Sequence, residues 1–446
     1  MITFISNSGE ICPVAQRIQK EGNDVQVYIH HPNYDASFDN ILPKVKLRDL
    51  PSAVRKSRLV IFDHVRPNLG LKRDTALLRV FNCDQESLSV FGPIAEKIRK
   101  RGVRVLGASS WTEQLELDRY FGSQVAKQCG FALPVTYDFK RISEAQQFLE
   151  TKQSRWVLKP HNNVDLDLTY VEQFPGELEY KLRHDIRNRV KTDNFPLMLQ
   201  KRIDGVALST ECWFNGTEFT VRNHTYEDKA LMPGGLGPHI GSQSNTVWTR
   251  QDALNKDILS KMNNLLPLLR ESGYIGPIDV NCIIAEKNNK PYFLEWTPRF
   301  GYDALFCLLE LYQGKYLDFF LNMDNSFDDR KFAASQRISI PPYPYEVPDV
   351  PLDPADTQVK ERADDKRFYW QDVKLENGLL QCAGADGIIG VAVSTGYSPG
   401  EAANNAYKSC REARIGAYKQ FRTDHKESAY KHLEKLPYVQ AKLGGK

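Results

Sequence analysis

The chain has 446 residues, of which 41% are hydrophobic and 26% charged, and this is the composition of a globular protein of about three domains. Its net charge of +3 is too small to indicate a nucleic-acid partner, and no apolar run is long enough to predict a membrane span. The eight cysteines are scattered without a C-x-x-C pair, which predicts reduced, buried thiols and a cytoplasmic location.

Strands alternate with helices over residues 1–110, and this alternation predicts a parallel α/β domain. The first 31 residues read as a strand, a glycine-containing turn, a helix and a second strand. Gly9 and Glu10 lie in that turn, at the carboxyl edge where sheets of this kind bind ligands. We therefore expect both residues to contact a substrate.

A larger α+β region is predicted over residues 111–330, with a small lid at about 135–200. A helix over 111–130 ends at Gly130, and "RWVLKPH" (155–161) reads as a strand. Residues 195–219 read as a hairpin-like pair of strands, and residues 252–274 as a long amphipathic helix. A second hairpin is expected to turn at residues 287–290.

The proline-rich stretch at 338–354 marks the connection into a last domain, predicted over residues 331–446. Strands are expected near 367–384 and 388–396, followed by a helix that begins at Ser398 and a helical tail. The lysines of this tail alternate with acidic residues, which is typical of a solvated helix face, so nucleic-acid binding is not expected.

"KPYFLEWTPRFG" (290–301) carries a carboxylate, a hydroxyl and a guanidinium at every second position, in Glu295, Thr297 and Arg299. At a period of two these side chains lie on one side of an extended strand. Asn281 and Asp279 share a face of the strand expected to pair with it. Carboxylate, amide and hydroxyl oxygens suit Mg²⁺, so Glu295, Asn281 and Thr297 are the candidate metal ligands.

Lys159 ends a buried apolar strand, where an ammonium without a counter-charge would be costly. It is therefore expected to meet an anion. Lysine and arginine around a hard-cation site are what a triphosphate requires, and this adds Arg119 and Arg299 to the candidates. Scattered salt bridges are the alternative interpretation.

Several segments together resemble the ATP-grasp ligases, in particular the glycinamide ribonucleotide synthetase (phosphoribosylamine–glycine ligase) family, over about residues 1–424. "EWTPRFGYDA" (295–304) is similar to the strand E-F-N-x-R-F-G-D-P-E that ends the family's metal site. "LELDRYFGSQVAKQCG" (115–130) matches its central helix, and "VLKP" (157–160) its phosphate-binding strand. "LQKRIDGVALSTECWFNG" (199–216) resembles the nucleotide hinge, and "EDKALMPGGLGPHIGSQS" (227–244) the loop around the substrates.

The resemblance implies an ATP-grasp fold and an ATP- and Mg²⁺-dependent carboxylate–amine ligase of purine biosynthesis, working through an acyl phosphate. The implied reactants are glycine or a similar amino acid, and phosphoribosylamine or a related amine such as a modified nucleoside or nucleotide. A monomer or a homodimer is expected. The implied catalytic and nucleotide-binding residues are Arg299, Lys159 and Arg119, with Gln200, Lys201, Ile203 and Glu211 also binding the nucleotide. The implied substrate residues are Gly9, Glu10, Asp228, Lys229, Gly237, Pro238, His239, Gly241 and Asp303.

Departures from the family pattern keep a second interpretation open. The flap after Lys159 contains no glycine, whereas the family's flap is glycine-rich so that backbone amides can close over phosphates. Thr297 replaces an asparagine ligand, and Val206 and Ala207 stand in place of paired glutamates. These changes favour the alternative of a non-catalytic nucleotide-binding protein on the same scaffold.

Overall fold

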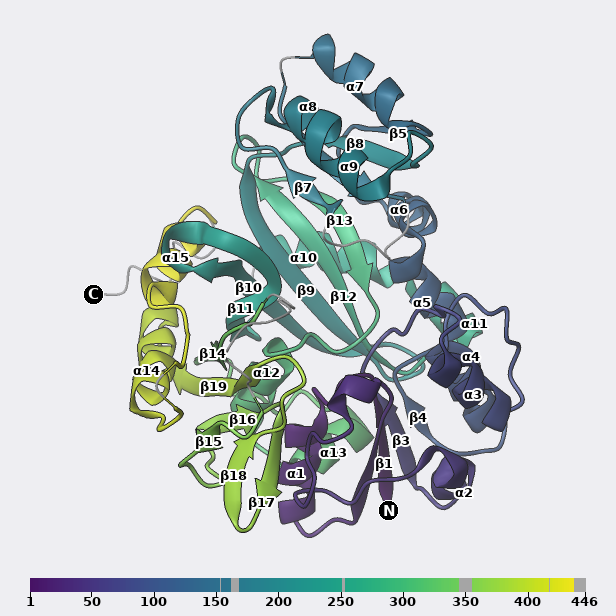
Figure 1. Cartoon of the computed structure of the whole chain (residues 1–446), viewed down its shortest axis with the longest axis vertical. Coiled ribbons are helices and arrows are strands. Elements are labelled where there is room, and N and C mark those ends of the chain that lie inside the picture. Colours follow the sequence, from purple (N-terminus) through teal and green to yellow (C-terminus); the bar gives the residue numbers. More distant parts are fainter. Residues whose placement is uncertain (153, 162–167, 251–252, 345–354, 417, 437–446) are drawn as a thin grey trace.

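The computed structural model describes residues 1–152, 154–161, 168–250, 253–344, 355–416 and 418–436. Figure 1 shows a long molecule with the N-terminal domain at one end, a small sheet with its own helices at the other, and a large antiparallel sheet between them. Among the described residues, no helix is long and apolar enough to cross a membrane.

The N-terminal domain is a parallel sheet in the order β2-β1-β3-β4, as the alternation of strands and helices predicts. All five residues of β1 are buried, which is typical of a parallel strand covered on both faces. Its strands are β1 (Ile2–Ser6), β2 (Val25–Ile29), β3 (Leu59–Phe62) and β4 (Val105–Leu106). Its helices are α1 (Cys12–Lys20), α2 (Leu50–Arg55), α3 (Lys72–Val80) and α4 (Phe91–Arg99).

A four-stranded sheet in the order β5-β8-β6-β7 occupies the region where the lid is predicted, and we call it the lid. Alternate residues of β6, such as Trp156 and Leu158, are buried in a core of their own, which separates the lid from the rest of the molecule. The strands are β5 (Thr136–Phe139), β6 (Trp156–Pro160), β7 (Tyr170–Val171) and β8 (Leu197–Lys201). The helices are α7 (Ile142–Glu150), α8 (Glu177–Lys181) and α9 (Arg187–Val190).

The central sheet has eight strands in the order β13-β12-β9-β10-β11-β14-β19-β16, and each described pair is antiparallel. The strands are β9 (Gly205–Phe214), β10 (Phe219–Met232), β11 (Leu236–Trp248), β12 (Gly276–Ala285), β13 (Pro291–Thr297), β14 (Phe332–Ser339), β16 (Phe368–Trp370) and β19 (Ile388–Gly396). A small sheet beside it contains β15 (Gln358–Val359), β17 (Val373–Glu376) and β18 (Leu379–Cys382).

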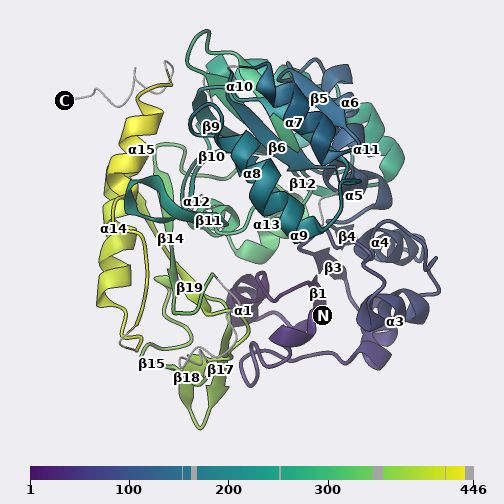
Figure 2. The same cartoon turned by 45° about the horizontal axis from the view of Figure 1, so that its top comes forward.

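Helices cover the central sheet and connect it to its neighbours, as the turned view in Figure 2 also shows. They are α5 (Ser110–Leu117), α6 (Arg119–Gln128), α10 (Ala253–Asn263), α11 (Leu266–Ser272), α12 (Ala304–Leu311), α13 (Tyr316–Asn322), α14 (Pro399–Glu412) and α15 (His425–Leu433). Ser398 caps α14 by accepting from the Glu401 N–H at 3.1 Å, which explains why that helix begins where the sequence predicts.

The structure differs from the sequence-based expectations at four places. The strands β14, β16 and β19 extend the central sheet, so the segment after residue 330 shares a sheet with the region before it. The hairpin-like pair at 195–219 is divided between two sheets, because β8 belongs to the lid and β9 to the central sheet. The helix over 111–130 breaks at Asp118, whose side chain caps α6, and the helix over 252–274 is interrupted between α10 and α11.

Candidate active site

The centre of the candidate site is formed by facing residues of neighbouring strands in the central sheet. In the pairing of β12 with β13, Asn281 lies opposite Glu295 and Asp279 lies opposite Thr297. β9 continues this face, because Ser209 lies opposite Asn281. Residues directly opposite each other in an antiparallel pair share a face of the sheet, so the strands bring the predicted oxygen ligands together.

These oxygens are connected by short contacts. Asn281 Nδ2 lies 3.3 Å from Thr297 Oγ1 and 3.1 Å from Asp279 Oδ2, which also accepts from Ser209 Oγ at 2.6 Å. Asp279 Oδ1 is buried and has no hydrogen-bond partner among the described residues. A buried acceptor of this kind, beside amide, hydroxyl and carboxylate oxygens, fits a hard cation.

Four cations surround Glu295, the carboxylate at the centre. Burial raises the pKa of Glu295, but the positive charges of Lys229, Lys159, Arg119 and Arg299 outweigh this effect, and the pKa is lower than usual. Protein atoms surround Glu295 on several sides although solvent still reaches it, and we call the region formed by Glu295, the four cations and the oxygens of Asn281 and Thr297 the cleft.

Lys159 is the last residue but one of β6 in the lid, and it is close enough to Glu295 of the central sheet for the two charges to interact. Burial lowers its pKa to about 8, and the positive charges of Arg119 and Lys229 add to the decrease while Glu295 opposes it. Arg119 is the first residue of α6, and its Nη1 donates to the Pro160 carbonyl oxygen at 2.6 Å. The break at Asp118 therefore directs a cation from the central helix to the strand that carries Lys159.

Lys229 joins the site from β10, and its neighbour Asp228 does not. Glu227 and Lys229, two residues apart, pair at 3.3 Å, and the charge of Glu227 raises the pKa of Lys229. Asp228 lies on the opposite face, is only 6% exposed, and accepts from His425 Nδ1 and Ser428 Oγ, both at 2.7 Å. The expectation that Asp228 contacts a substrate is therefore wrong, because this carboxylate attaches α15 to the sheet.

Arg299 is held by Glu116, a residue of α5. Its Nε and Nη2 each lie 3.0 Å from Glu116 Oε1, and its guanidinium lies 5.4 Å from the centre of the Tyr302 ring. The positive charge of Arg299 lowers the pKa of Glu295 in the cleft. It also opposes the increase that burial causes in the pKa of Glu10, in the N-terminal domain. Arg299 therefore lies between two groups of acidic residues.

The predicted nucleotide hinge lies where the lid joins the central sheet. Gln200 and Lys201 end β8, and Ile203 lies in the short connection to β9. The Lys201 N–H donates to the Val135 carbonyl oxygen at 2.7 Å, so the Lys201 N–H is used within the lid. The flap after Lys159 is described only up to residue 161 and again from 168, so most of it lies outside the described residues.

Glu211, which the resemblance implies as a nucleotide-binding residue, lies far from the hinge along β9. Glu211 lies six residues after Gly205, where β9 begins, and this is about 20 Å along the strand. It is 5% exposed, accepts from Trp213 Nε1 at 2.8 Å and is hydrogen-bonded to the Gly301 backbone. Burial, followed by the charge of Asp279, raises its pKa to about 8. Glu211 therefore stabilises the turn after Arg299.

The predicted glycine-rich substrate loop is the end of a long hairpin formed by β10 and β11. Its tip at Pro233–Gly235 is exposed, and the Gly234 N–H donates to Asp424 Oδ2 at 2.7 Å. His239 pairs with Ala230 across the hairpin, and burial and then the charge of Lys229 lower its pKa. His239 is thus the member of this loop that lies near the cleft. Gly237, Pro238 and Gly241 lie on β11, where the two glycines are exposed.

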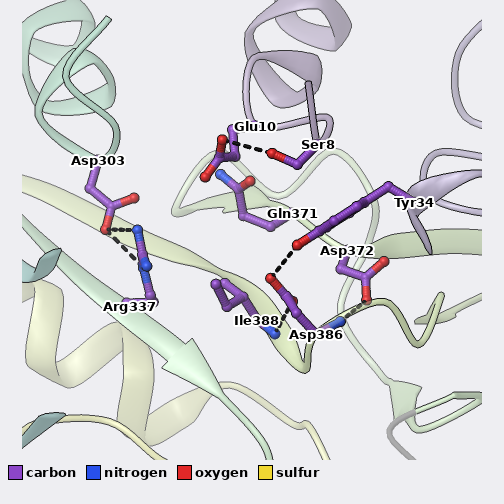
Figure 3. Close-up of a pocket in the computed structure, with 9 residues that line it drawn as sticks. All are labelled: Ser8, Glu10, Tyr34, Asp303, Arg337, Gln371, Asp372, Asp386 and Ile388. Carbon is purple, nitrogen blue, oxygen red and sulfur yellow. Dashed lines mark hydrogen bonds and ion pairs between the residues drawn. The ribbon is translucent and has the colours of Figure 1, made fainter. Parts of the chain in front are cut away.

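Glu10 and Asp303 meet in a small cavity between the N-terminal domain, α12 and the C-terminal strands (Figure 3). Glu10 accepts from Ser8 Oγ at 2.9 Å, and Asp386 Oδ2 accepts from Tyr34 Oη at 2.8 Å. Asp303 binds Arg337 through contacts of 3.1 Å. The cavity is lined by Ser8, Glu10, Tyr34, Asp303, Arg337, Gln371, Asp372, Asp386 and Ile388, and we call it the acidic cavity.

Sequence reasoning missed several of these residues. Glu227 could have been found, because it stands two positions before Lys229 on the same strand and must share its face. Arg337, Asp372 and Asp386 carried no local signal, because they come from three separate strands or loops that only the tertiary structure brings to Glu10.

The chain is similar to known ligases in sequence and in structure. It is 22% identical over 366 residues to the phosphoribosylamine–glycine ligases of two Helicobacter pylori strains, covering 78% of this chain and 81% of each relative. The phosphoribosylamine–glycine ligase of Thermotoga maritima superposes with a TM-score of 0.69 at 16% identity, covering 95% of this chain and 100% of that one.

Biotin carboxylase of Campylobacter jejuni superposes with a TM-score of 0.62 at 13% identity, covering 98% of this chain and 97% of that one. No protein-family model matches the sequence. The predicted ATP-grasp fold and the resemblance to phosphoribosylamine–glycine ligase are both confirmed.

Proposed function

We propose that this chain, which has the ATP-grasp fold, is an ATP-dependent ligase that joins a carboxylate to an amine. The observation that carries the proposal is the position of Glu295 among Lys159, Lys229, Arg119 and Arg299, beside the oxygens of Asn281 and Thr297. A triphosphate carries several negative charges and needs cations that converge from different directions. Here the cations come from the lid, the central helix, strand β10 and the turn that follows β13.

The reaction has two steps at the same site, a phosphoryl transfer to the carboxylate and then an acyl transfer to the amine. A carboxylate oxygen of the first substrate attacks the γ-phosphorus of ATP, the bond to ADP breaks, and an acyl phosphate forms. The nitrogen lone pair of the amine then attacks the acyl carbon, phosphate leaves with the electrons of the broken C–O bond, and the nitrogen loses a proton. The products are an amide, ADP and phosphate.

The cations of the cleft neutralise and orient the phosphates during the first transfer. Lys159 and Arg119 approach the phosphate chain from the lid side, and Lys229 approaches from the central sheet. Glu116 fixes the guanidinium of Arg299 through two nitrogens, which limits its rotation and keeps its charge in place. Electrostatic positioning of this kind needs no nucleophilic side chain.

Mg²⁺ would be held by Glu295, Asn281 and Thr297, and when bound it would neutralise charge on the phosphate oxygens. Among the described residues, no three His, Cys, Asp or Glu side chains form a preformed metal cluster. Mg²⁺ takes few protein ligands and completes its shell with phosphate oxygens and water.

The named relatives support glycine or a similar amino acid as the carboxylate substrate. They support phosphoribosylamine as the amine, or a related amine such as a modified nucleoside or nucleotide.

The test is Mg²⁺-dependent ADP release by the purified chain, supplied with ATP, glycine or another amino acid, and a panel of amines. Release that requires both an amino acid and an amine, and that yields an amide by mass spectrometry, supports the ligase. ATP binding without ADP release over the whole panel would favour a non-catalytic nucleotide-binding protein. Lys159→Ala should weaken ATP binding in either case, since its charge serves the phosphates in both.

A further inference from the structure

The acidic cavity lies beside the proposed reaction centre. Tyr302 follows Arg299 by three residues, its Oη donates to the Asp63 carbonyl oxygen at 3.4 Å, and it is hydrogen-bonded to Glu10. Arg299 is close enough to act on the charges of both Glu10 and Glu295. The cavity is therefore in the right place for the second substrate, the amine.

The exposed charges of this cavity are negative. Glu10 and Asp386 are partly exposed, whereas Arg337, the only cation among the described residues that line it, is 8% exposed and bound to Asp303. Asp303 is itself 1% exposed, so this pair is closed to a ligand. A ligand that enters therefore meets carboxylates and hydroxyls.

The carboxyl groups repel one another, and the nearby arginines offset burial and repulsion only in part: Arg337 acts on Glu10 and Asp386, and Arg299 acts on Glu10. Burial raises the pKa of Glu10 and of Asp386, and it raises the pKa of Asp372, which lies next to them. The negative charge of Asp386 further raises the pKa of Glu10, and the negative charge of Asp372 further raises the pKa of Asp386. A positive group placed between them would relieve both effects.

In the N-terminal domain, the backbone amides that could bind a phosphate already donate to the carboxylate of Asp63. In parallel α/β domains the amides between the first strand and the first helix commonly bind anions. Here Asp63 takes this position, because it accepts from the Asn7 N–H at 3.3 Å, from the Ile11 backbone and from Ser6 Oγ at 2.5 Å. Pro13, at the start of α1, has no N–H to offer.

The size of the acidic cavity also favours an ammonium group over a phosphate group. The cavity has a volume of about 20 Å³, enough for one water-sized group. An ammonium group has that size and donates hydrogen bonds that Glu10, Asp386 and the Tyr34 oxygen can accept. A phosphate group is larger and would bring two negative charges next to carboxylates.

We propose that the acceptor amine binds as its ammonium ion in the acidic cavity, between Glu10 and Asp386, and that it carries no phosphate group. The proposal rests on the proposed ligase function and narrows its substrate class to phosphate-free amines, such as an amino sugar or a nucleoside amine.

The experiment compares amines with and without a phosphate ester on the purified full-length chain. Matched pairs are ethanolamine with O-phosphoethanolamine, and glucosamine with glucosamine 6-phosphate. Calorimetry measures their dissociation constants, and ADP release with ATP, Mg²⁺ and amino acids is measured separately. We expect the phosphate-free member of at least one pair to bind about tenfold or more tightly than its ester.

Two substitutions test whether the preference for phosphate-free amines arises in the acidic cavity. Glu10→Gln and Asp386→Asn should each reduce the preference about tenfold by removing one carboxylate from the cavity. Glu271→Gln, an exposed glutamate on α11, is the matched control and should leave the preference unchanged. Circular dichroism shows whether each variant is folded, and a variant that fails to fold is replaced by Tyr34→Phe, which removes one acceptor of the same ammonium.

Equal or tighter binding of the phosphate esters would overturn the inference, and so would the absence of binding by every amine at millimolar concentrations. A preference that survives both substitutions would also overturn it. Phosphate discrimination without ADP release would contradict the ligase function alone. ADP release that prefers 5-phosphoribosylamine to ribosylamine, both generated in situ, would contradict the inference and leave the ligase function intact.

Discussion

The cleft around Glu295 and the acidic cavity around Glu10 are neighbours with opposite charge. In the cleft a single central carboxylate is surrounded by four cations, whereas in the cavity the accessible groups are carboxylates and the one lining cation is buried in an ion pair. The difference matches the two kinds of reactant that a carboxylate–amine ligase must hold together, a polyanion and an amine. Arg299 lies between the two regions and acts on both.

The largest expected effect comes from removing the central charge of the cleft. Glu295→Gln keeps the size of the side chain but removes the proposed metal ligand and the counter-charge of the cations. We expect Mg²⁺-dependent ADP release to fall roughly a hundredfold or more, while the far-UV circular dichroism stays unchanged. Glu286→Gln, just after β12, is the matched control because Glu286 is exposed and pairs with Lys435. Full activity of Glu295→Gln would remove Glu295 from the site.

The link between the two regions is tested by Arg299→Lys. A lysine cannot reproduce the contacts of two guanidinium nitrogens with Glu116, so its charge would no longer be fixed between cleft and cavity. We expect KM to rise about tenfold for both ATP and the amine in steady-state kinetics. Arg183→Lys, on the exposed surface of the lid, should change neither value. If KM rises for ATP and stays the same for the amine, Arg299 contributes to the cleft alone.

Asp228 lies near neither reactant, and its substitution separates stability from function. Asp228→Asn weakens charge-assisted hydrogen bonds with His425 and Ser428 beneath α15, so the free energy of unfolding should fall by about 1–3 kcal/mol. Chemical denaturation measures this loss, and KM for ATP should stay the same. An increased KM with unchanged stability would return Asp228 to the list of substrate residues.

The smallest expected effect is a dependence on pH in the cleft. Because the pKa of Lys159 is lowered to about 8, the free protein loses this positive charge as the pH rises through that value. KM for ATP should therefore increase a few-fold between pH 7 and 9, and the acidic cavity should not contribute to this change. Lys159→Arg keeps its charge over the same range and should remove the dependence. A profile identical in both proteins would assign the titration to another group.

Much of the cleft could be predicted from sequence because its signals are local. Alternation along a single strand predicts that Glu295 and Thr297 share a face, and the hairpin turn at 287–290 places Asn281 beside them. A charged residue at the end of a buried strand, such as Lys159, is conspicuous for the same reason. The alternating strands and helices of residues 1–110 likewise predict the parallel sheet without further information.

The errors arose where the local conformation was misjudged. The segment 227–244 was expected to be a loop, and in a loop Asp228 and Lys229 can both face a substrate. In the structure this segment is part of two long strands, so adjacent residues face opposite sides and only Lys229 reaches the cleft. Glu211 was likewise expected to bind the nucleotide, whereas in the structure it lies well along β9 from the hinge and is buried against Trp213 and the turn at Gly301.

The sequence by itself determined which residues are proposed to neutralise and hold a metal–triphosphate, since their types and their spacing along the chain are typical of that chemistry. Only the tertiary structure decided the character of the second site. Arg337 and Asp386 come hundreds of positions after Glu10 in the chain, and the three residues meet because β14 and β19 join the central sheet beside the N-terminal domain. The structure also decided that Arg337 is buried against Asp303, and this pair is what leaves the cavity negative.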